Sequence, residues 1–254
     1  VLKFGGTSVG SPERMRHVAE LITKERRNVI VLSAMSGTTN TLVEIAEYLY
    51  KGNIPGAQET VNGLYAKYMT VVEQLLTTMQ AKARAAAAIT RVFALLRSYF
   101  SEPLTEAGEK EILAQGELMS TSLMQCYLEE QGVKSVLLPA LDFMRTLDSG
   151  EPDMQHIQVR LRRMIDLEPD AELFITQGYI CRNDHGGIDN LKRGGSDYTA
   201  SILGAVLDAD EIQIWTDIDG MHNNDPRYVE GTKPVSTLHF EEAAELAYFG
   251  AKIL

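Results

Sequence analysis

Leu191-Lys192-Arg193-Gly194-Gly195-Ser196-Asp197-Tyr198-Thr199-Ala200 joins two basic residues and a glycine pair to the start of an apolar helical pattern. Ser196 is a good N-cap residue, and apolar or small residues then recur at helical spacing, at Ala200, Leu203, Gly204 and Leu207. The free N–H groups and the positive end of the helix dipole would meet at the glycines, which predicts an anion site. A plain loop before a capped helix is the alternative, but the flanking Arg193 and Asp197 favour a ligand site.

The whole chain is acidic, so such an anion must be held locally. Its 254 residues carry a formal net charge of -11 and could form one large α/β domain or two lobes. An acidic surface repels phosphate backbones, which argues against a nucleic acid or an anionic membrane as partner. We therefore expect a compact cluster of cations around any anionic ligand.

Cysteines and histidines do not indicate a disulfide framework or a protein-held metal. The two cysteines, Cys126 and Cys181, are far apart in sequence, and the five histidines lack a metal-binding spacing. No apolar run is long enough to cross a bilayer, and Val1-Leu2-Lys3 has no signal-peptide layout. We expect a cytoplasmic protein with no metal ligands of its own.

The pattern of strand, polar loop and helix recurs along the chain. Residues 1–4 form a β pattern that ends near Lys3 and leads into a glycine and hydroxyl loop, and residues 28–32 lead into a second hydroxyl-rich loop. Strands are also predicted at 133–138, 172–178 and 211–215. Alternating strands and helices predict an α/β fold with a mainly parallel sheet between helices, whose carboxyl-end loops meet at one edge.

Two helical regions complete this reading. Residues 56–100 are alanine-rich with few β formers and indicate a helical insertion over one lobe, without evident chemistry. The final helix is amphipathic, with Phe240, Ala243, Ala244, Ala247 and Tyr248 on its apolar side, and it is expected to end at Gly250. Beyond it, Lys252 could reach the site or simply complement the helix C-terminus.

The helix that begins near Thr105 contains the most informative residue. Glu117 falls in the same angular sector as Leu113, Ser120, Met124 and Leu128. A carboxylate on such a stripe needs a cation, backbone donors or a cationic group of a ligand, because burying it alone is costly. A structural ion pair and a ligand contact both remain open at this point.

The loops at the sheet edge collect groups that suit a nucleoside triphosphate. Glycines supply backbone donors, cations oppose phosphate charge, and hydroxyls and aspartates orient the ligand, among Lys3, Gly5, Gly6, Ser33, Thr39, Arg193, Ser196, Asp197, Thr216, Asp217 and Arg227. There is no Gly-Lys dipeptide for a Walker A loop, and no G-x-G-x-x-G, H-R-D or D-F-G motif. The common nucleotide-binding motifs are therefore excluded.

Six segments nevertheless resemble, in order, the motifs of the aspartokinases, within the amino-acid-kinase superfamily. They are Lys3-Phe4-Gly5-Gly6-Thr7-Ser8-Val9, Gly116-Glu117-Leu118-Met119-Ser120, Arg193-Gly194-Gly195-Ser196-Asp197-Tyr198-Thr199, Trp215-Thr216-Asp217, Asp225-Pro226-Arg227 and Phe249-Gly250-Ala251-Lys252. The resemblance implies a three-layer α/β/α sandwich of the amino-acid-kinase and carbamate-kinase type. It also implies transfer of the ATP γ-phosphate to L-aspartate, giving 4-phospho-L-aspartate in the first step of lysine, threonine and methionine biosynthesis.

The same resemblance implies roles for individual residues. Lys3 and Lys252 would neutralise the transferring group, and Asp197 would orient the lysines. Aspartate would be bound by Ser33, Thr39, Glu117, Arg193, Gly194, Gly195 and Ser196, with Glu117 at its ammonium. The nucleotide would be bound by Lys3, Gly5, Gly6, Ser8, Thr216, Asp217, His222, Arg227, Lys252 and Ile253. ATP is the co-substrate, and Mg²⁺ is expected to arrive on its phosphates.

Domain organisation also follows from the resemblance. Residues 1–254 would be the catalytic domain, with an aspartate-binding lobe over about 1–190, its insertion at about 56–100, and a nucleotide-binding lobe over about 191–254. The regulatory ACT domains usual in aspartokinases are expected to be absent from this chain, and a homo-oligomer is expected. His222 stands where many members have tyrosine, which makes its nucleotide contact a point of difference.

Two rival functions are considered. A superfamily kinase for another small acid, such as acetylglutamate, needs no acidic partner for a free ammonium, so Glu117 discriminates against it. A nucleotide or amino-acid sensor without turnover need not retain both Lys3 and Lys252.

Overall fold

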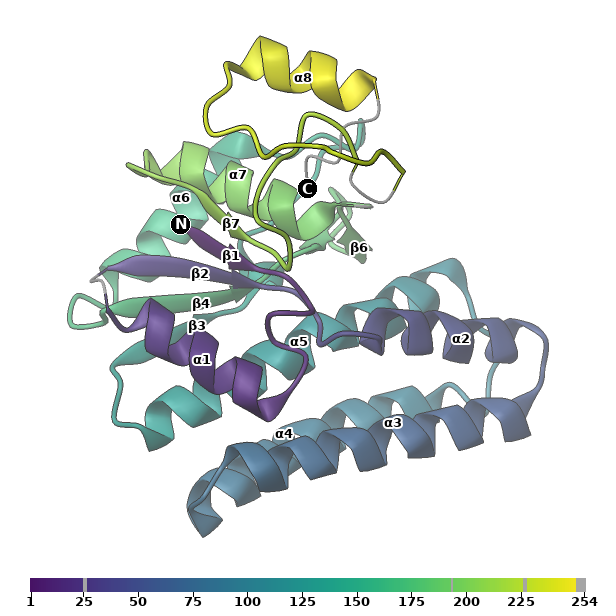
Figure 1. Ribbon diagram of the computed structural model, residues 1–254. Coiled ribbons are helices and arrows are strands. Elements are labelled where there is room, and N and C mark those ends of the chain that lie inside the picture. Colours follow the sequence, from purple (N-terminus) through teal and green to yellow (C-terminus); the bar gives the residue numbers. More distant parts are fainter. Residues whose placement is uncertain (25–26, 193, 226–227, 250–254) are drawn as a thin grey trace.

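A single parallel sheet organises the molecule, which we describe from a computed structural model covering residues 1–24, 27–192, 194–225 and 228–249 (Figure 1). The sheet order is β3-β4-β2-β1-β7, and every neighbouring pair is parallel. The strands are β1 Leu2–Phe4, β2 Asn28–Leu32, β3 Ser135–Leu138, β4 Leu173–Gln177 and β7 Gln213–Trp215. A separate antiparallel hairpin joins β5 Ile180–Arg182 to β6 Ile188–Asn190.

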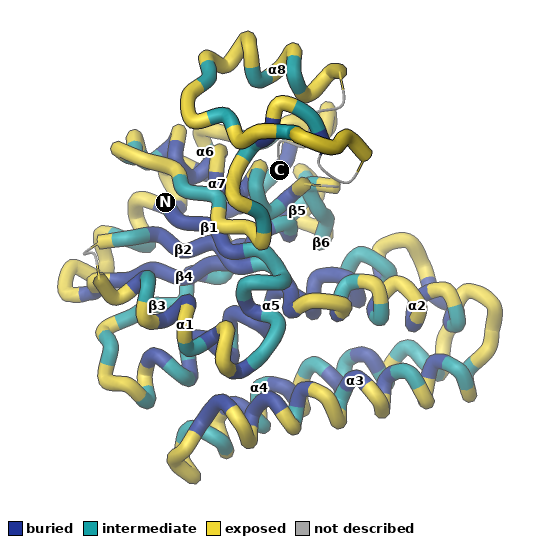
Figure 2. Tube along the Cα trace, viewed as in Figure 1, coloured by how far each residue is buried: buried dark blue, intermediate teal, exposed yellow. Residues whose placement is uncertain are grey.

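Helices cover both faces of the sheet, as the alternation of strands and helices predicts. The helices are α1 Pro12–Ile22, α2 Thr38–Tyr50, α3 Ile54–Leu75, α4 Met79–Ser98, α5 Glu106–Glu130, α6 Met154–Asp166, α7 Gly195–Leu207 and α8 Phe240–Tyr248, with a short 3-10 turn at Ala140–Asp142. In β2, Ile30 and Leu32 join the core beneath α1 and α5, whereas Val29 and Val31 join the core beneath α6 and α7. Because alternate residues of a strand face opposite sides, this confirms the three-layer α/β/α sandwich (Figure 2).

The predicted helical region folds as an antiparallel hairpin of α3 and α4. It packs against α2 and α5, so that these four helices extend the molecule beyond the sheet (Figure 1). Its apolar residues, including Tyr68 and Phe93, belong to the same core as β1 and β2. The helical prediction for this segment is confirmed, and the hairpin is continuous with the main core.

The final helix differs from its prediction. Phe240 and Tyr248, which the pattern assigns to a packing side, are 93% and 85% exposed, and no residue of α8 is buried against the described part of the chain. The helix ends at Tyr248, and the predicted end at Gly250 lies outside the described residues. An amphipathic pattern identifies a helix, but it does not identify what covers it.

No helix within the described ranges is long and apolar enough to span a membrane.

Candidate active site

A cavity of about 500 Å³ opens where the carboxyl ends of β1, β2 and β4 meet the start of α7. Its walls come from five segments of the chain, and its lining is Lys3, Gly6, Ser33, Ala34, Met35, Ser36, Gly37, Thr39, Asn40, Glu117, Tyr179, Lys192, Gly194, Gly195, Ser196 and Asp197. Carboxyl ends of parallel strands are the usual ligand-binding edge of such folds. The structure therefore brings together most of the sequence-predicted substrate residues, namely Ser33, Thr39, Glu117, Gly194, Gly195 and Ser196.

Lys3 and Asp197 form an ion pair in this cavity. The Lys3 ammonium nitrogen lies 2.6 Å from Asp197 Oδ1, and the two side chains are 10% and 20% exposed. Lys3 is carried by β1, between two other strands, and Asp197 by the first turn of α7. A carboxylate on the helix side thus holds the lysine near the helix N-terminus, where anions are favoured.

The loop after β1 approaches the loop after β2 closely enough to require glycine. A Cβ at Gly6 would lie 2.7 Å from the Ala34 carbonyl oxygen, and the Ser36 N–H donates to the Gly6 carbonyl at 3.0 Å. The neighbouring Gly5 would place a Cβ 3.5 Å from the Lys3 ammonium nitrogen. Gly6 thus lets the two loops meet directly at the end of the sheet.

Glu117 faces the cavity from α5 with one oxygen unsatisfied. Its residue is 3% exposed, its Oε1 accepts from the Ala34 N–H at 3.2 Å, and its Oε2 has no hydrogen-bond partner among the described residues. Burial raises the pKa of Glu117 to about 7, because a charged carboxylate loses solvation there. Within the described ranges the Ala34 N–H meets part of the predicted need for a partner, and Oε2 keeps capacity for a ligand.

Contacts around Glu117 fix its helix against the loop after β2 and the end of β4. A Cβ at Gly116 would lie 2.8 Å from Ala34 Cβ, so the glycine allows α5 to approach the loop after β2. Ser120 Oγ donates to the Ser33 carbonyl at 2.8 Å, and Thr121 Oγ1 donates to the Glu117 carbonyl at 2.8 Å. Gln177 at the end of β4 is buried and donates from Nε2 to Thr121 Oγ1 at 2.7 Å.

The start of α7 corrects one detail of the sequence reading. Gly194, with φ 75°, is the N-cap residue and Ser196 lies inside the first turn, so Ser196 does not cap the helix. A Cβ at Gly178 would lie 2.5 Å from Ser196 Oγ, and one at Gly195 would lie 2.9 Å from Tyr179 Cδ2. The glycine pair is thus explained by a left-handed cap and by close contact with the loop after β4.

Seven lining residues were not among the sequence-predicted site residues, namely Ala34, Met35, Ser36, Gly37, Asn40, Tyr179 and Lys192. Tyr179 and Lys192 have φ angles of 69° and 62°, in the left-handed region that non-glycine residues seldom adopt. Strained backbone of this kind concentrates at functional sites. Lys192 is one of the two basic residues in the stretch predicted to bind an anion, but it was not named among the candidate site residues.

The predicted nucleotide residues divide between two places. Ser8, Thr216 and Asp217 line a neighbouring cavity of about 320 Å³ beside Trp215. Gly5 lines neither cavity, and its N–H donates to the Trp215 carbonyl at 3.4 Å. His222 lines neither cavity, and its Nε2 lies 2.6 Å from Asp219 Oδ1. Arg193, Arg227, Lys252 and Ile253 lie outside the described residues, so their roles stay predictions.

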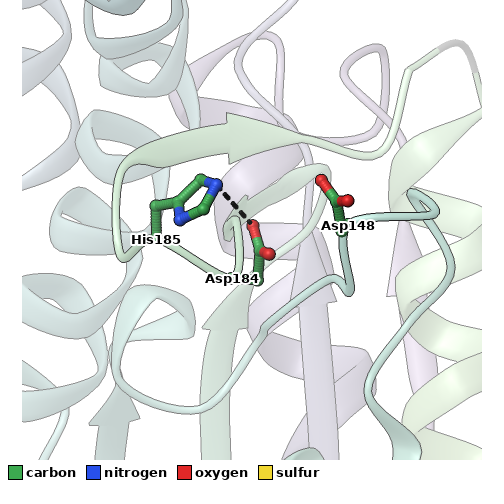
Figure 3. A group of neighbouring side chains, drawn as sticks. All are labelled: Asp148, Asp184 and His185. Atoms are coloured by element: carbon green, nitrogen blue, oxygen red, sulfur yellow. Dashed lines mark ion pairs between the residues drawn. The ribbon is translucent and has the colours of Figure 1, made fainter.

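A separate cluster of possible metal ligands lies on the surface. Asp148, Asp184 and His185 are exposed, with ligand atoms within 4.8 Å of one another, and His185 Nε2 is 3.7 Å from Asp184 Oδ1 (Figure 3). None of the three lines the 500 Å³ cavity. Exposed groups of this kind are common on an acidic surface, and the cluster has no part in the site.

Known proteins are similar to this chain in sequence and in structure. The chain is 35% identical to lysine-sensitive aspartokinase 3 of Escherichia coli over all of its own length and 57% of that protein, and 34% identical to chloroplastic aspartokinase 1 of Arabidopsis thaliana over 46% of that protein. It spans less than two thirds of these curated relatives. A crystal structure of E. coli aspartokinase III in complex with aspartate and ADP superposes with a TM-score of 0.86 at 34% identity, over all of this chain and 57% of that one.

More distant structures share the fold alone. An isopentenyl phosphate kinase matches 96% of the chain with a TM-score of 0.51 at 12% identity. The sequence pattern of the amino acid kinase family matches residues 1–254. The chain therefore belongs to the amino acid kinase family.

Proposed function

We propose that this chain catalyses phosphorylation of the side-chain carboxylate of L-aspartate by ATP, giving 4-phospho-L-aspartate. The observation that carries the proposal is the buried carboxylate of Glu117, with one unsatisfied oxygen, in the same cavity as the Lys3–Asp197 pair. A substrate with a free ammonium and two carboxylates supplies the charges this cavity lacks. The aspartate and ADP named for the E. coli relative support the assignment.

The amino acid binds with its ammonium on Glu117. In the ligand complex this ammonium donates to Oε2 and keeps the carboxylate ionised, because an adjacent positive charge lowers a carboxyl pKa. Thr39, Ser33 and the N–H groups at the start of α7 bind the carboxylates, together with Arg193. Lys192 adds a cation at the same rim, because it lines the cavity and forms no ion pair within the described part of the chain.

Phosphoryl transfer then needs positioning and charge neutralisation. The aspartate side chain, with an ordinary pKa of about 3.9, is already ionised and needs no general base. A carboxylate oxygen attacks the γ-phosphorus while the bond from that phosphorus to the bridging oxygen breaks, and ADP leaves with the electron pair. Lys3, held by Asp197 and joined by Lys252, neutralises the two anions as they meet.

The nucleotide is placed between the two cavities. Its γ-phosphate lies near Lys3 and Gly6, and the rest extends towards Ser8, Thr216 and Asp217, with His222, Arg227 and Ile253 beyond. Glu117 and Asp197 are the described carboxylates of the main cavity, and here Glu117 is assigned to the substrate ammonium while Asp197 is paired with Lys3. Mg²⁺ is therefore expected on the ATP phosphates, and no step depends on a protein-held ion.

Several wider features belong to the same proposal. These are an aspartate-binding part over about 1–190, a nucleotide-binding part over about 191–254, assembly as a homo-oligomer, a cytoplasmic location, and a place in lysine and threonine biosynthesis. Their support is the family membership and the named relatives.

A hydroxamate assay tests the activity directly. The purified protein is incubated with ATP, Mg²⁺, hydroxylamine and either L-aspartate or N-acetylglutamate. We expect hydroxamate from aspartate alone. Product from N-acetylglutamate only would support a kinase for another acid, and binding of ATP and aspartate without product would support a sensor.

A further inference from the structure

Two consecutive residues of α3 contact the loop that lines the cavity after β2. The ammonium of Lys67 donates to the Ser36 carbonyl at 3.0 Å, and the Tyr68 hydroxyl lies 3.0 Å from Thr38 Oγ1. Both contacts join positions about 30 residues apart in sequence. The helical hairpin, in which the sequence indicated no chemistry, therefore reaches the candidate active site.

The contacted loop depends on support from outside. Residues 33–37 and the first turn of α2 line the cavity, through Ser33, Ser36 and Thr39 among others. Gly37, the N-cap of α2, has φ 79° and provides no side-chain cap. This end of the helix thus lacks the usual local hydrogen bond that fixes it.

The hairpin replaces that local support with a buried contact. Tyr68 and Thr38 are both completely buried, and the Tyr68 ring packs near Phe93 of α4 with centroids 6.4 Å apart. Tyr68 is carried by α3 and its ring packs near α4, so both helices of the hairpin set the position of its hydroxyl. A hydrogen bond between fully buried groups is costly to leave unmade.

We propose that the α3–α4 hairpin positions the cavity loop for the amino-acid substrate, with Lys67 and Tyr68 as positioning residues. Lys67 fixes the carbonyl before Gly37, and Tyr68 fixes the first residue of α2. Thr39 follows directly and lines the cavity. This inference rests on the proposed function. It adds Lys67 and Tyr68 as residues that support the loop proposed to bind aspartate.

The test compares two variants that release the loop with two that do not. Tyr68→Phe and Lys67→Met remove the loop contacts. Tyr65→Phe and Lys82→Met remove contacts internal to the hairpin, namely Tyr65 with Thr90 at 3.3 Å and Lys82 with Glu73 at 2.6 Å. All four are studied in the full chain, and Lys67→Arg serves as the conservative rescue.

We expect a selective loss of aspartate affinity. Each loop variant raises KM for aspartate about 5- to 10-fold, as loss of one hydrogen bond implies, with little change in kcat or in KM for ATP. The hairpin controls leave KM for aspartate unchanged, and Lys67→Arg restores it. A fall in Tm with unchanged KM for aspartate in Tyr68→Phe and Lys67→Met would overturn the proposal, because a purely structural role predicts that result.

Amide hydrogen exchange separates this inference from the proposed activity. Exchange at residues 34–40 should accelerate in the loop variants and not in the controls, whatever the reaction. If the wild-type chain formed no acyl phosphate but the exchange pattern held, the activity would fail and the positioning role would stand. Unchanged exchange at 34–40 in both loop variants would contradict the positioning role itself.

Discussion

Two carboxylates face the same cavity and differ in how their charge is balanced. Asp197, at the start of α7, is paired with Lys3 at 2.6 Å. Glu117, on α5, has a backbone N–H on one oxygen and no described partner on the other, and its pKa is raised to about 7 by burial. The Lys3 ammonium, held by Asp197, can bind an anionic group, and the Glu117 oxygen that has no described partner can bind a cationic group. One cavity thus contains complementary ends for a zwitterionic substrate and a phosphate.

The largest expected effect comes from removing the lysine of the Lys3–Asp197 pair. Lys3→Ala should lower kcat by about 10³-fold, because a preorganised cation at the transferring group is lost. The Kd for ATP should rise far less, as measured by calorimetry beside the kinetics. Lys110→Ala is the matched control, since Lys110 pairs with Glu106 and Asp189 outside the cavity. An effect of Lys3→Ala confined to ATP binding would favour a sensor over a kinase.

The buried carboxylate of Glu117 should make the free energy of unfolding depend on pH. Glu117 has a folded pKa of about 7 and a reference value of 4.5, so the folded state holds a proton that the unfolded state has lost between these values. Stability therefore falls as pH rises through this window, by about 3 kcal/mol for a shift of this size. Burial, with a smaller contribution from the charge of Glu117, raises the pKa of Tyr68 and of Tyr179, so both remain neutral in this window.

Urea unfolding of the wild type and Glu117→Gln at pH 5 and pH 8 measures this contribution. The variant should lack the loss of stability that the wild type shows on going to pH 8. If the free energy of unfolding changed equally in the two proteins between pH 5 and pH 8, burial would not disfavour the ionised form of Glu117.

The substitution Glu117→Gln should also weaken the binding of L-aspartate. Glu117→Gln is expected to raise KM for aspartate about 30-fold, since a hydrogen bond to a charged group is lost, while KM for ATP changes little. Glu111→Gln on the same helix is the control, because Glu111 accepts from Tyr99 and does not line the cavity. An unchanged KM for aspartate in Glu117→Gln would remove the ammonium from its assigned place.

The smallest effect is expected at the rim. Lys192→Gly should stabilise the fold by about 1 kcal/mol, because glycine adopts the left-handed backbone at φ 62° without strain. It should also raise KM for aspartate about threefold, as loss of an exposed cation implies. Lys192→Met separates the two effects, since it removes the charge and keeps the strain. A Lys192→Gly variant with unchanged Tm and KM would exclude Lys192 from the site.

The sequence predicted the architecture well because strands and loops follow local patterns. The run at 28–32 and the loop after it were readable as a buried strand ending at the ligand edge, and the structure agrees. Glu117 was recognisable because a carboxylate on an apolar stripe violates the helical pattern. What covers each element was not readable, as the exposed apolar side of α8 demonstrates.

Contacts between distant segments account for the remaining differences. Ser196 looks like a cap, but the left-handed Gly194 caps α7 and frees Ser196 to pack against Gly178. The support from Lys67 and Tyr68 arises because the hairpin folds back onto a loop 30 residues earlier, which no local pattern encodes. Tertiary packing, rather than propensity, decided these positions.

The most direct test of the account is the pKa of Glu117 with and without substrate. Carbon NMR of glutamate-labelled protein, assigned with Glu117→Gln, would follow the carboxyl signal through a pH titration. We expect a pKa near 7 in the free protein, a fall below that value when L-aspartate binds, and no such fall with N-acetylaspartate, which lacks the ammonium. A pKa that remains near 7 with aspartate bound would show that Glu117 does not bind the substrate ammonium.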